Sequence, residues 1–337
     1  MAGVVFSKLS GKNDSLYKAV EGVLTEIITD VDTGKNKDDE VLNAVFNVKS
    51  SKKFGERTGG MTEFGNFAPV GEGDKAENDE LQEGFAKLIH HYAFSKGFVI
   101  TREMMDDGRL DDAKLIAANY MKAYKRSKLE FATAFLTAEG TTFNYMGKTF
   151  DRTTGDGVGL FATNHPGKKA GVSAQSNVFT NPLGTDIRVL NYLANMGRNF
   201  KNDSGNLMGY TYDTIMIPGN TPALEETVNR IIYTGNGAVG TDLNDINTQK
   251  GKWKMIVNHR WEAASGTAPY IITSSEANKA LMALMFYNRI ALDIANEVDI
   301  HTRNFEWNGY TRFSVGAFNW RACIMGGAQT GSTLTLP

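Results

Sequence analysis

The chain has 337 residues, enough for two ordinary domains, or one large one, and for a substantial hydrophobic core. With 36 basic and 38 acidic residues its formal net charge is −2, so bulk electrostatics give it no reason to coat nucleic acid or an anionic membrane. A single cysteine, Cys323, excludes intrachain disulfides and zinc sites built from several thiolates. With no apolar run long enough to span a membrane and no signal-type segment, we expect a soluble protein of a reducing cytoplasm.

The first expected element is a helix that opens at Asp14 or Ser15, because apolar residues recur at helical spacing through Ile28. The polar stretch 30–40 is expected to end this helix. Residues 41–48 (VLNAVFNV) are rich in β-forming residues and predict a short strand.

Residues 49–83 differ in composition from the rest of the chain, because they are rich in glycine and charge and poor in large aliphatic residues. The charges fall into a basic limb of Lys49, Lys52, Lys53 and Arg57 and an acidic limb of Glu72, Asp74, Glu77, Asp79, Glu80 and Glu83. A stretch this polar cannot bury a core of its own. It is either a solvated or disordered loop, or a long arm whose two charged limbs find partners on another subunit.

The middle of the chain begins with an aromatic, alternating run at 85–101 that predicts a strand, with a bend or bulge at Gly97. Residues 109–137 carry the strongest local signal and predict one long helix with a broad apolar face. Acidic residues lie at its start and lysines and arginines come later, an order that suits the helix dipole.

The second half predicts alternating elements. We expect loops and short strands over 140–180, then a helix at 181–200, a strand at 212–218, a helix at 223–233, strands at 253–257 and 270–273, a helix at 275–296, and a β-rich end over 299–325.

Two glycine motifs resemble nucleotide-binding motifs, but the residues around them do not fit such a site. Residues 235–240 (GNGAVG) fit G-x-G-x-x-G, but a helix precedes them and a polar loop follows, whereas a dinucleotide site needs a strand before and a helix after. We interpret them as a flexible loop. Residues 147–149 (GKT) look like the end of a phosphate-binding loop, but Thr142 stands where the required glycine should be.

The histidines and the cysteine show no catalytic or metal-binding spacing. His90 and His91 are adjacent, so on a strand they face opposite sides, while His165, His259 and His301 are isolated. Cys323 lies in an alternating apolar run, which favours a buried core residue over a nucleophile paired with a histidine. We predict no catalytic, cofactor-binding or metal-binding residues, and a structural or interaction protein rather than an enzyme.

The order of these parts resembles the major capsid proteins of tailed bacteriophages, particularly the Mu-like major head subunit branch. The resemblance rests on the arm 49–83 followed by 100–107 (ITREMMDD) and the long helix, on 160–166 (LFATNHP) followed by Ser176-Asn177, on 206–210 (NLMGY) followed by 215–218 (IMIP), and on the ending 310–321 (YTRFSVGAFNWR) with Gly326-Gly327. It covers nearly the whole chain from about residue 40. The resemblance depends on the order of these segments along the chain, since no single motif is highly specific.

The resemblance implies an α+β fold, the tailed-phage and herpesvirus major capsid fold. Mapped by position, residues 1–48 would form an N-terminal arm and 49–100 an extended β-hairpin arm. Residues 101–150 and 298–330 would form a peripheral domain with a long spine helix, and 151–297 an axial domain. The two limbs of charge would then be intersubunit contacts.

The implied function is that of a structural protein of the virion, which self-assembles in the bacterial host cytoplasm into the hexamers and pentamers of an icosahedral head around double-stranded DNA. Implied partners are a separate scaffolding protein, a portal and possibly a decoration protein, with no membrane and no cofactor. Contact with the enclosed DNA would be at most non-specific, through Lys122, Lys125, Arg126 and Lys128.

Two alternatives stay open. An encapsulin-like shell of a bacterial compartment would share the fold but hold protein cargo. A cytosolic nucleotide-dependent enzyme using the loop 235–240 is the alternative from another class.

Overall fold

The structure, a computed structural model, describes residues 15–33, 36–61, 64, 67, 69–73, 75, 78, 83–184, 188–234 and 247–335. Its helices are α1 (Ser15–Thr33), α2 (Lys37–Val45), α3 (Arg102–Asp106), α4 (Leu110–Thr137), α5 (Arg188–Arg198), α6 (Pro222–Tyr233) and α7 (Ser275–Ala280). Its strands are β1 (Asn47–Ser50), β2 (Gly55–Met61), β3 (Glu83–His90), β4 (Tyr92–Ile100), β5 (Thr142–Tyr145), β6 (Lys148–Asp151), β7 (Thr214–Pro218), β8 (Lys254–Asn258), β9 (Tyr270–Thr273), β10 (Leu284–Val298), β11 (Phe305–Ala317) and β12 (Cys323–Gly326).

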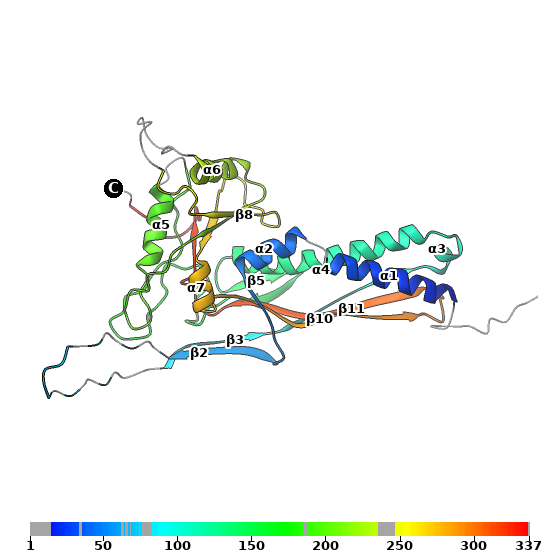
Figure 1. Cartoon of the computed structure of the whole chain (residues 1–337), viewed down its shortest axis with the longest axis horizontal. Coiled ribbons are helices and arrows are strands. Elements are labelled where there is room, and N and C mark those ends of the chain that lie inside the picture. Colours follow the sequence, from blue (N-terminus) through cyan, green and yellow to red (C-terminus); the bar gives the residue numbers. More distant parts are fainter. Residues whose placement is uncertain are drawn as a thin grey trace, which may run out of the picture.

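Two sheets organise the molecule. The first has the order β1-β10-β11-β4, and its centre is a long antiparallel ribbon of β10 and β11. The second has the order β12-β9-β7-β8 and mixes a parallel pair, β7 and β8, with antiparallel neighbours. In Figure 1 the ribbon runs along the length of the molecule, and the second sheet with α5 and α6 lies at one end of it.

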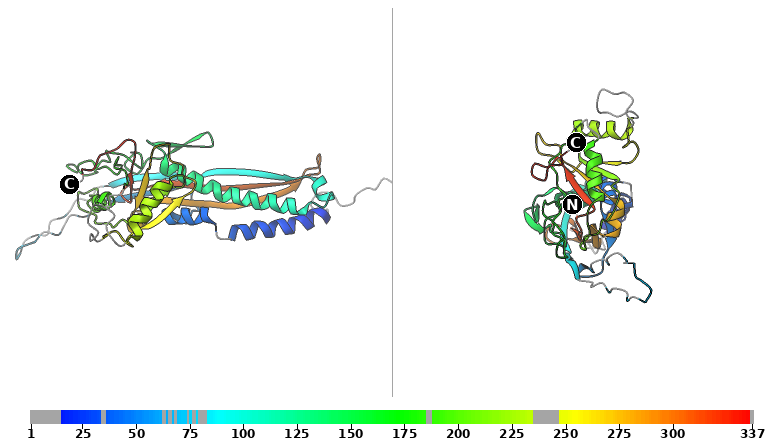
Figure 2. Two further views of the ribbon diagram at one scale, coloured as in Figure 1. Left: turned by 90° about the horizontal axis from the view of Figure 1, so that it is seen from above. Right: turned by 90° about the vertical axis from the view of Figure 1, so that its left-hand side faces the viewer.

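Helix α4 lies along the ribbon, with α1 beside it (Figures 1 and 2). Small buried residues on α4, Ala113 and Ala117, allow close packing against Phe305 and Trp307 of β11 and Leu24 of α1. Exposed polar residues alternate with buried ones along β11, as expected of a strand with one face on a core. The far end of the ribbon therefore has a core of its own.

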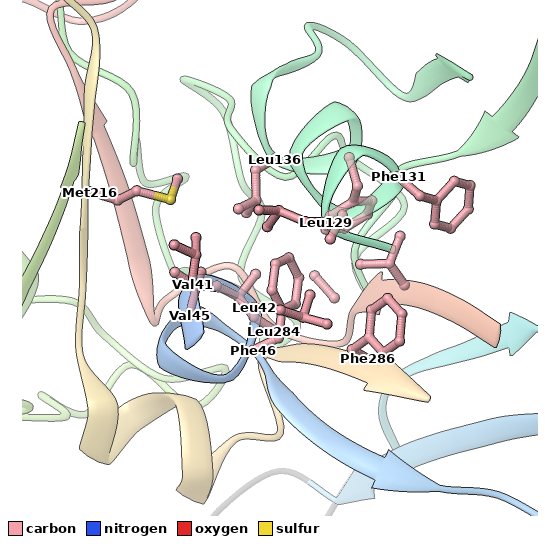
Figure 3. Close-up of a cluster of buried hydrophobic side chains, with 14 of the residues drawn as sticks. Val41, Leu42, Val45, Phe46, Leu129, Phe131, Leu136, Met216, Leu284 and Phe286 are labelled. Carbon is pink, nitrogen blue, oxygen red and sulfur yellow. The ribbon is translucent and has the colours of Figure 1, made fainter. Parts of the chain in front are cut away.

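A second core joins the two halves of the molecule at the C-terminal end of α4. Figure 3 shows Val41 and Val45 of α2 close to Leu136 of α4 and Leu284 of β10, with Met216 of β7 facing them from the second sheet. These side chains are almost fully buried. Because both sheets contribute to one cluster, they are held in a fixed relation to α4.

Buried Arg152 satisfies the last carbonyls of α4. Its guanidinium donates from Nε to the carbonyl oxygen of Phe135 at 2.5 Å, and from its two terminal nitrogens to Leu136 at 3.1 Å and Gly140 at 3.0 Å. Burial lowers the pKa of Arg152 to about 10, so the group remains charged at neutral pH. A cation at this end complements the helix dipole and binds carbonyls that the helix itself cannot satisfy.

Most elements expected from the sequence are confirmed. The helix expected over 109–137 is α4, the first helix is α1, and the β-rich end is β11 and β12. The predicted strands at 212–218, 253–257 and 270–273 match β7, β8 and β9, and the helix at 223–233 matches α6.

Other predictions were wrong. Residues 41–45 are helical, because their apolar residues recur at helical spacing and the side chain of Asn36 accepts from the Asp38 amide and caps α2. The polar stretch 30–40 was expected to end the first helix, but α1 continues into this stretch as far as Thr33. Of the helix expected at 181–200, residues 181–184 are not helical, and α5 is described from Arg188 to Arg198.

The largest error concerns the helix expected over 275–296. Only α7 is helical, and residues from Leu284 onward form β10. The first residues of β10 are buried on both faces and read as a continuous apolar run, which sequence periodicity cannot distinguish from a buried helix. Pairing with β1 on one side and β11 on the other decides the conformation.

The sheets suggest a different place for the division between peripheral and axial parts. β10 shares its sheet with β11, and β12 shares its sheet with β9. We therefore propose that residues 284–317 belong with α4 in the peripheral part and that β12 belongs to the axial part.

Phe131 of α4 is the centre of an aromatic cluster, and its removal tests this packing. Its ring lies 5.1 to 6.3 Å from the rings of Tyr92, Phe94, Phe143, Tyr145, Phe150 and Phe313. We expect Phe131→Ala to lower the free energy of unfolding by about 3–5 kcal/mol, measured by urea denaturation. Leu115→Ala, on the exposed face of the same helix, should change it by less than about 0.5 kcal/mol. Equal effects of the two variants would contradict the assignment.

Candidate subunit-contact arm

The hairpin of β2 and β3 projects from the body, as Figure 1 shows, and pairs with no other strand among the described residues. We call residues 54–90 the arm. An isolated two-stranded ribbon is marginal in water, so its stability depends on contacts elsewhere. Within the predicted range 49–100, residues 55–61 and 83–90 form this hairpin, so the solvated-loop interpretation does not hold for them, whereas β4 pairs with β11 of the body. That 49–100 forms one extended arm stays a prediction.

The structure places the predicted basic limb on the surface where the arm leaves the body. Lys49 lies on β1, Arg57 on β2, and Lys52 and Lys53 on the connection between them, all exposed. Lys53 forms an ion pair with Glu56 at 3.4 Å. Within the described residues Lys52 and Arg57 form no ion pair, so they remain available to another chain.

Only part of the acidic limb can be placed. Glu72 is exposed, and Glu83 is exposed at the start of β3. Asp74, Glu77, Asp79 and Glu80 lie outside the described residues. The structure therefore brings no basic residue of the first limb against an acidic residue of the second limb in the described part of the chain.

Sequence reasoning missed the apolar side chains of the arm. Phe67 is fully exposed, Phe54 is 75% exposed, and Phe64 and Val70 are also exposed. Folded monomers rarely expose several large apolar groups on one projecting segment unless a partner covers them. The signal that could have found them is aromatic residues inside a stretch that has no core.

The base of the arm is anchored at several points. Lys87 pairs with Asp151 and also donates to Thr153, and Lys168 lies 5.1 Å from the centre of the Phe85 ring. Ile89 is buried against Met285, Tyr287 and Phe318. Gly316 allows this, because a Cβ there would lie 2.6 Å from Cδ1 of Ile89.

His165, in the LFATNHP segment, is a structural residue. Its Nδ1 lies 2.7 Å from Asp156 Oδ2 and its Nε2 lies 3.1 Å from Asn177 Oδ1. The Asn177 amide nitrogen donates to two carbonyls, so its oxygen faces the ring and accepts from Nε2. Burial would raise the pKa of Asp156, but hydrogen bonds from His165 and from a neighbouring hydroxyl lower it below its ordinary value.

This pair is enclosed by other side chains. His165 and Asp156 are fully buried, and Trp320 stacks on the imidazole with ring centres 4.3 Å apart. The pair joins two parts of the loop after β6, and the stacking of Trp320 joins this loop to the segment between β11 and β12, so the contacts are structural.

The other candidate groups are structural as well. His259 and Arg260 bind Asp38 of α2. Across the described residues no group of three or more His, Cys, Asp or Glu side chains is placed to hold a metal ion.

Residues 235–240 lie outside the described residues, and residues 147–149 belong to the β5–β6 hairpin. No helix of the described chain is long and apolar enough to cross a membrane.

The basic residues considered for DNA contact are largely occupied. Lys125 is buried and pairs with Asp39 at 3.1 Å, Arg126 pairs with Glu130, and Lys128 lies over the ring of Tyr124. Lys122 is exposed. These four residues therefore do not form one free basic patch.

The two sheets, the long helix on a β-ribbon and the projecting hairpin together make the fold of tailed-phage major capsid proteins, which the comparison with solved structures shows. A chain from the capsid of the native GTA particle matches with a TM-score of 0.55 and 10% identity over 87% of this chain and 91% of that one. One from Mycobacterium phage Patience matches with a TM-score of 0.54 and 11% identity, over 97% and 94%. One from the capsid of Myoviridae phage XM1 gives 0.51 and 12%, over 83% and 88%.

The sequence itself matches no protein-family model and no curated protein. The fold predicted from the ordered set of motifs is confirmed by these structural matches. Membership of the Mu-like branch stays a prediction.

Cys323 tests the structural interpretation of the candidate nucleophile. Its side chain is fully buried, and burial raises the pKa of its thiol to about 12 although Arg152 acts in the opposite direction. We expect an aromatic disulfide reagent at neutral pH to leave the native chain unmodified and to label one thiol per chain in urea. Rapid stoichiometric labelling of the native chain would contradict the buried position.

Proposed function

We propose that this chain is the structural subunit of an icosahedral shell, the major capsid protein of a phage head that encloses double-stranded DNA. The observation that carries the proposal is the arm, a two-stranded hairpin with exposed phenylalanines on a body with the capsid fold. An arm without a core becomes stable when it lies on another copy of the chain. Rings of identical chains, hexamers and pentamers, supply such contacts and close on themselves.

The body offers an apolar surface that suits such an arm. A groove of about 620 Å³ lies between α4, β4 and the β5–β6 hairpin and is lined by aromatic side chains that include Tyr124, Tyr145 and Phe150. Exposed Lys96 and Lys148 also line it and would complement an acidic limb. We propose that the arm of a neighbouring copy covers this groove.

The function needs no catalytic residue, and Cys323 and His165, the two buried groups most like catalytic ones, are both occupied structurally. A scaffolding protein, a portal and a decoration protein are the further partners of the proposal, and the virion is the proposed location. Assembly would take place in the host cytoplasm.

The size of the purified full-length chain tests the proposal. Sedimentation and negative-stain microscopy should show capsomer rings or closed shells. Phe67→Ser should reduce them strongly while changing the free energy of unfolding by less than about 0.5 kcal/mol, because the side chain is fully exposed in the single chain. Leu115→Ser, an exposed apolar residue of α4, is the matched control. A parent chain that stays a monomer or dimer under all conditions would refute the shell function.

The cargo separates a phage head from an encapsulin-like compartment, since the two share a fold. Nucleic acid within purified particles supports the first and a protein cargo the second.

The two charged limbs predict that assembly depends on salt. Each exposed ion pair contributes only about 0–1 kcal/mol, but every subunit of a ring repeats it. We expect the yield of assembled particles to fall steadily as ionic strength rises, because screening weakens contacts between exposed charges. The replacement of Lys52 and Arg57 by glutamine should flatten this dependence. Identical yields across a wide salt series would argue against charged intersubunit contacts.

A further inference from the structure

A single residue, His91, separates β3 of the arm from β4 of the body. β3 pairs with β2, while β4 pairs with β11 of the ribbon, so the chain changes partner at this residue. Although it lies at a change of direction, His91 is buried. The sequence predicted the bend at Gly97 instead, but Gly97 is an ordinary residue of β4, paired with Asn308.

The imidazole of His91 is bound from both sides. Its Nε2 lies 3.1 Å from Ser51 Oγ, next to the arm, and its Nδ1 lies 2.9 Å from Ser314 Oγ on β11. Ser51 Oγ in turn lies 2.7 Å from Glu56 Oε1 on β2. The chain Glu56–Ser51–His91–Ser314 therefore connects the first strand of the arm with the ribbon through the ring.

The direction of each hydrogen bond in this relay can be assigned. The carboxylate of Glu56 can only accept, so the Ser51 hydroxyl donates to it and accepts from the N–H of His91 Nε2. In the neutral ring Nδ1 is then the acceptor, and the Ser314 hydroxyl donates to it. Protonation would turn Nδ1 from an acceptor into a donor and force the Ser314 hydroxyl to accept instead of donate.

The surroundings favour that neutral form. Burial is the largest cause that lowers the pKa of His91, and Arg289 on β10, Arg312 on β11 and His90 on β3 lower it further, while Glu56 acts in the opposite direction. Lys53 faces Glu56, and the ring of Tyr287, whose pKa burial raises to about 12, stands edge-on to the imidazole at 6.0 Å. Protonation would place a third cation beside two guanidinium groups.

We propose that His91 is a proton-sensitive pivot: its neutral ring holds the arm at a fixed angle to the body, and its protonation loosens the arm. The structure leaves room for the movement, because a cavity of about 300 Å³ lies between Thr58, Phe85 and Lys87 of the arm and Met282, Phe318 and Trp320 of the body. Buried Ile89 and the Lys87–Asp151 pair stay in place, so the arm loosens without detaching.

The sign of the pH effect follows from the lowered pKa. Above the ordinary histidine pKa of about 6.5 the ring is neutral whether the relay is formed or open, and the relay contributes fully. As the pH falls below that value, the open state binds a proton that the closed state excludes, so the closed state loses stability. Glu56, whose carboxylate accepts from Ser51, has a lowered pKa and remains ionised over this range.

Hydrogen–deuterium exchange of the full-length chain in its smallest soluble form tests the pivot. When the pH falls from about 7.5 to about 5.5, amides of β2 and β3 should exchange about fivefold faster or more, after correction for intrinsic rates, while those paired between β10 and β11 should not. His91→Gln, which can donate to Ser51 and accept from Ser314 but cannot titrate, should abolish the increase. His90→Gln, the exposed neighbour, should retain it.

Ser51→Ala removes the link to the arm and leaves the ring in place. At about pH 7.5, the arm amides of this variant should exchange as fast as those of the parent chain at about pH 5.5. The proposal is overturned if the parent shows no increase or if His91→Gln keeps it. If amides of the ribbon also exchange faster in His91→Gln, that variant has disturbed the body and cannot decide the question. In that case the proposal is overturned if the arm of Ser51→Ala exchanges as slowly as the arm of the parent. The measurement concerns one chain, so its outcome is independent of whether the chain forms shells.

Discussion

The buried guanidinium of Arg152 is the contact on which both halves of the molecule depend. It closes the C-terminal end of α4 by binding three carbonyls, and this is also where α2, the ribbon and the second sheet meet in one core. No carboxylate pairs with it among the described residues, so the carbonyls and the helix dipole must compensate its desolvation. A neutral side chain of similar size would leave those carbonyls without donors, beside the core to which both halves contribute side chains.

Helix α2 couples the halves through two adjacent acidic residues that face different ways. Asp38 is buried against His259 and Arg260 after β8, while Asp39 pairs with buried Lys125 of α4. Breaking a buried pair is costly because the remaining charge has no solvent, whereas an exposed pair such as Lys53–Glu56 contributes little. The buried charges of α2 thus bind partners within the body, whereas Lys52 and Arg57 at the base of the arm are exposed.

The sequence predicted what local periodicity determines and failed where tertiary contacts decide. Helix α4 and strand β11 carry clear periods of 3.6 and 2, and both were predicted. β10 was predicted as a helix because its first residues are buried on two faces, and α2 as a strand because Val41 and Val45 were judged by residue type instead of spacing. The pivot at His91 was beyond prediction, since Ser51 and Ser314 are distant in sequence. Of the candidate contact residues, the charges were found from composition, whereas Phe54 and Phe67 were overlooked because a charged stretch was taken to be wholly polar.

The near-zero net charge has a physical role in the proposed shell that composition alone did not reveal. Electrostatic repulsion among many identical subunits grows with the square of their charge, so a large net charge of either sign would oppose close packing. A net charge of −2, made of separate basic and acidic stretches, removes that repulsion and still leaves strong local fields to orient one copy on the next. The exposed phenylalanines can then supply the affinity, which charge pairs in water cannot. An arm with both features is complementary to a neighbour only at a defined angle, and this is why the residue that sets the angle of the arm, His91, matters as much as the contacts themselves.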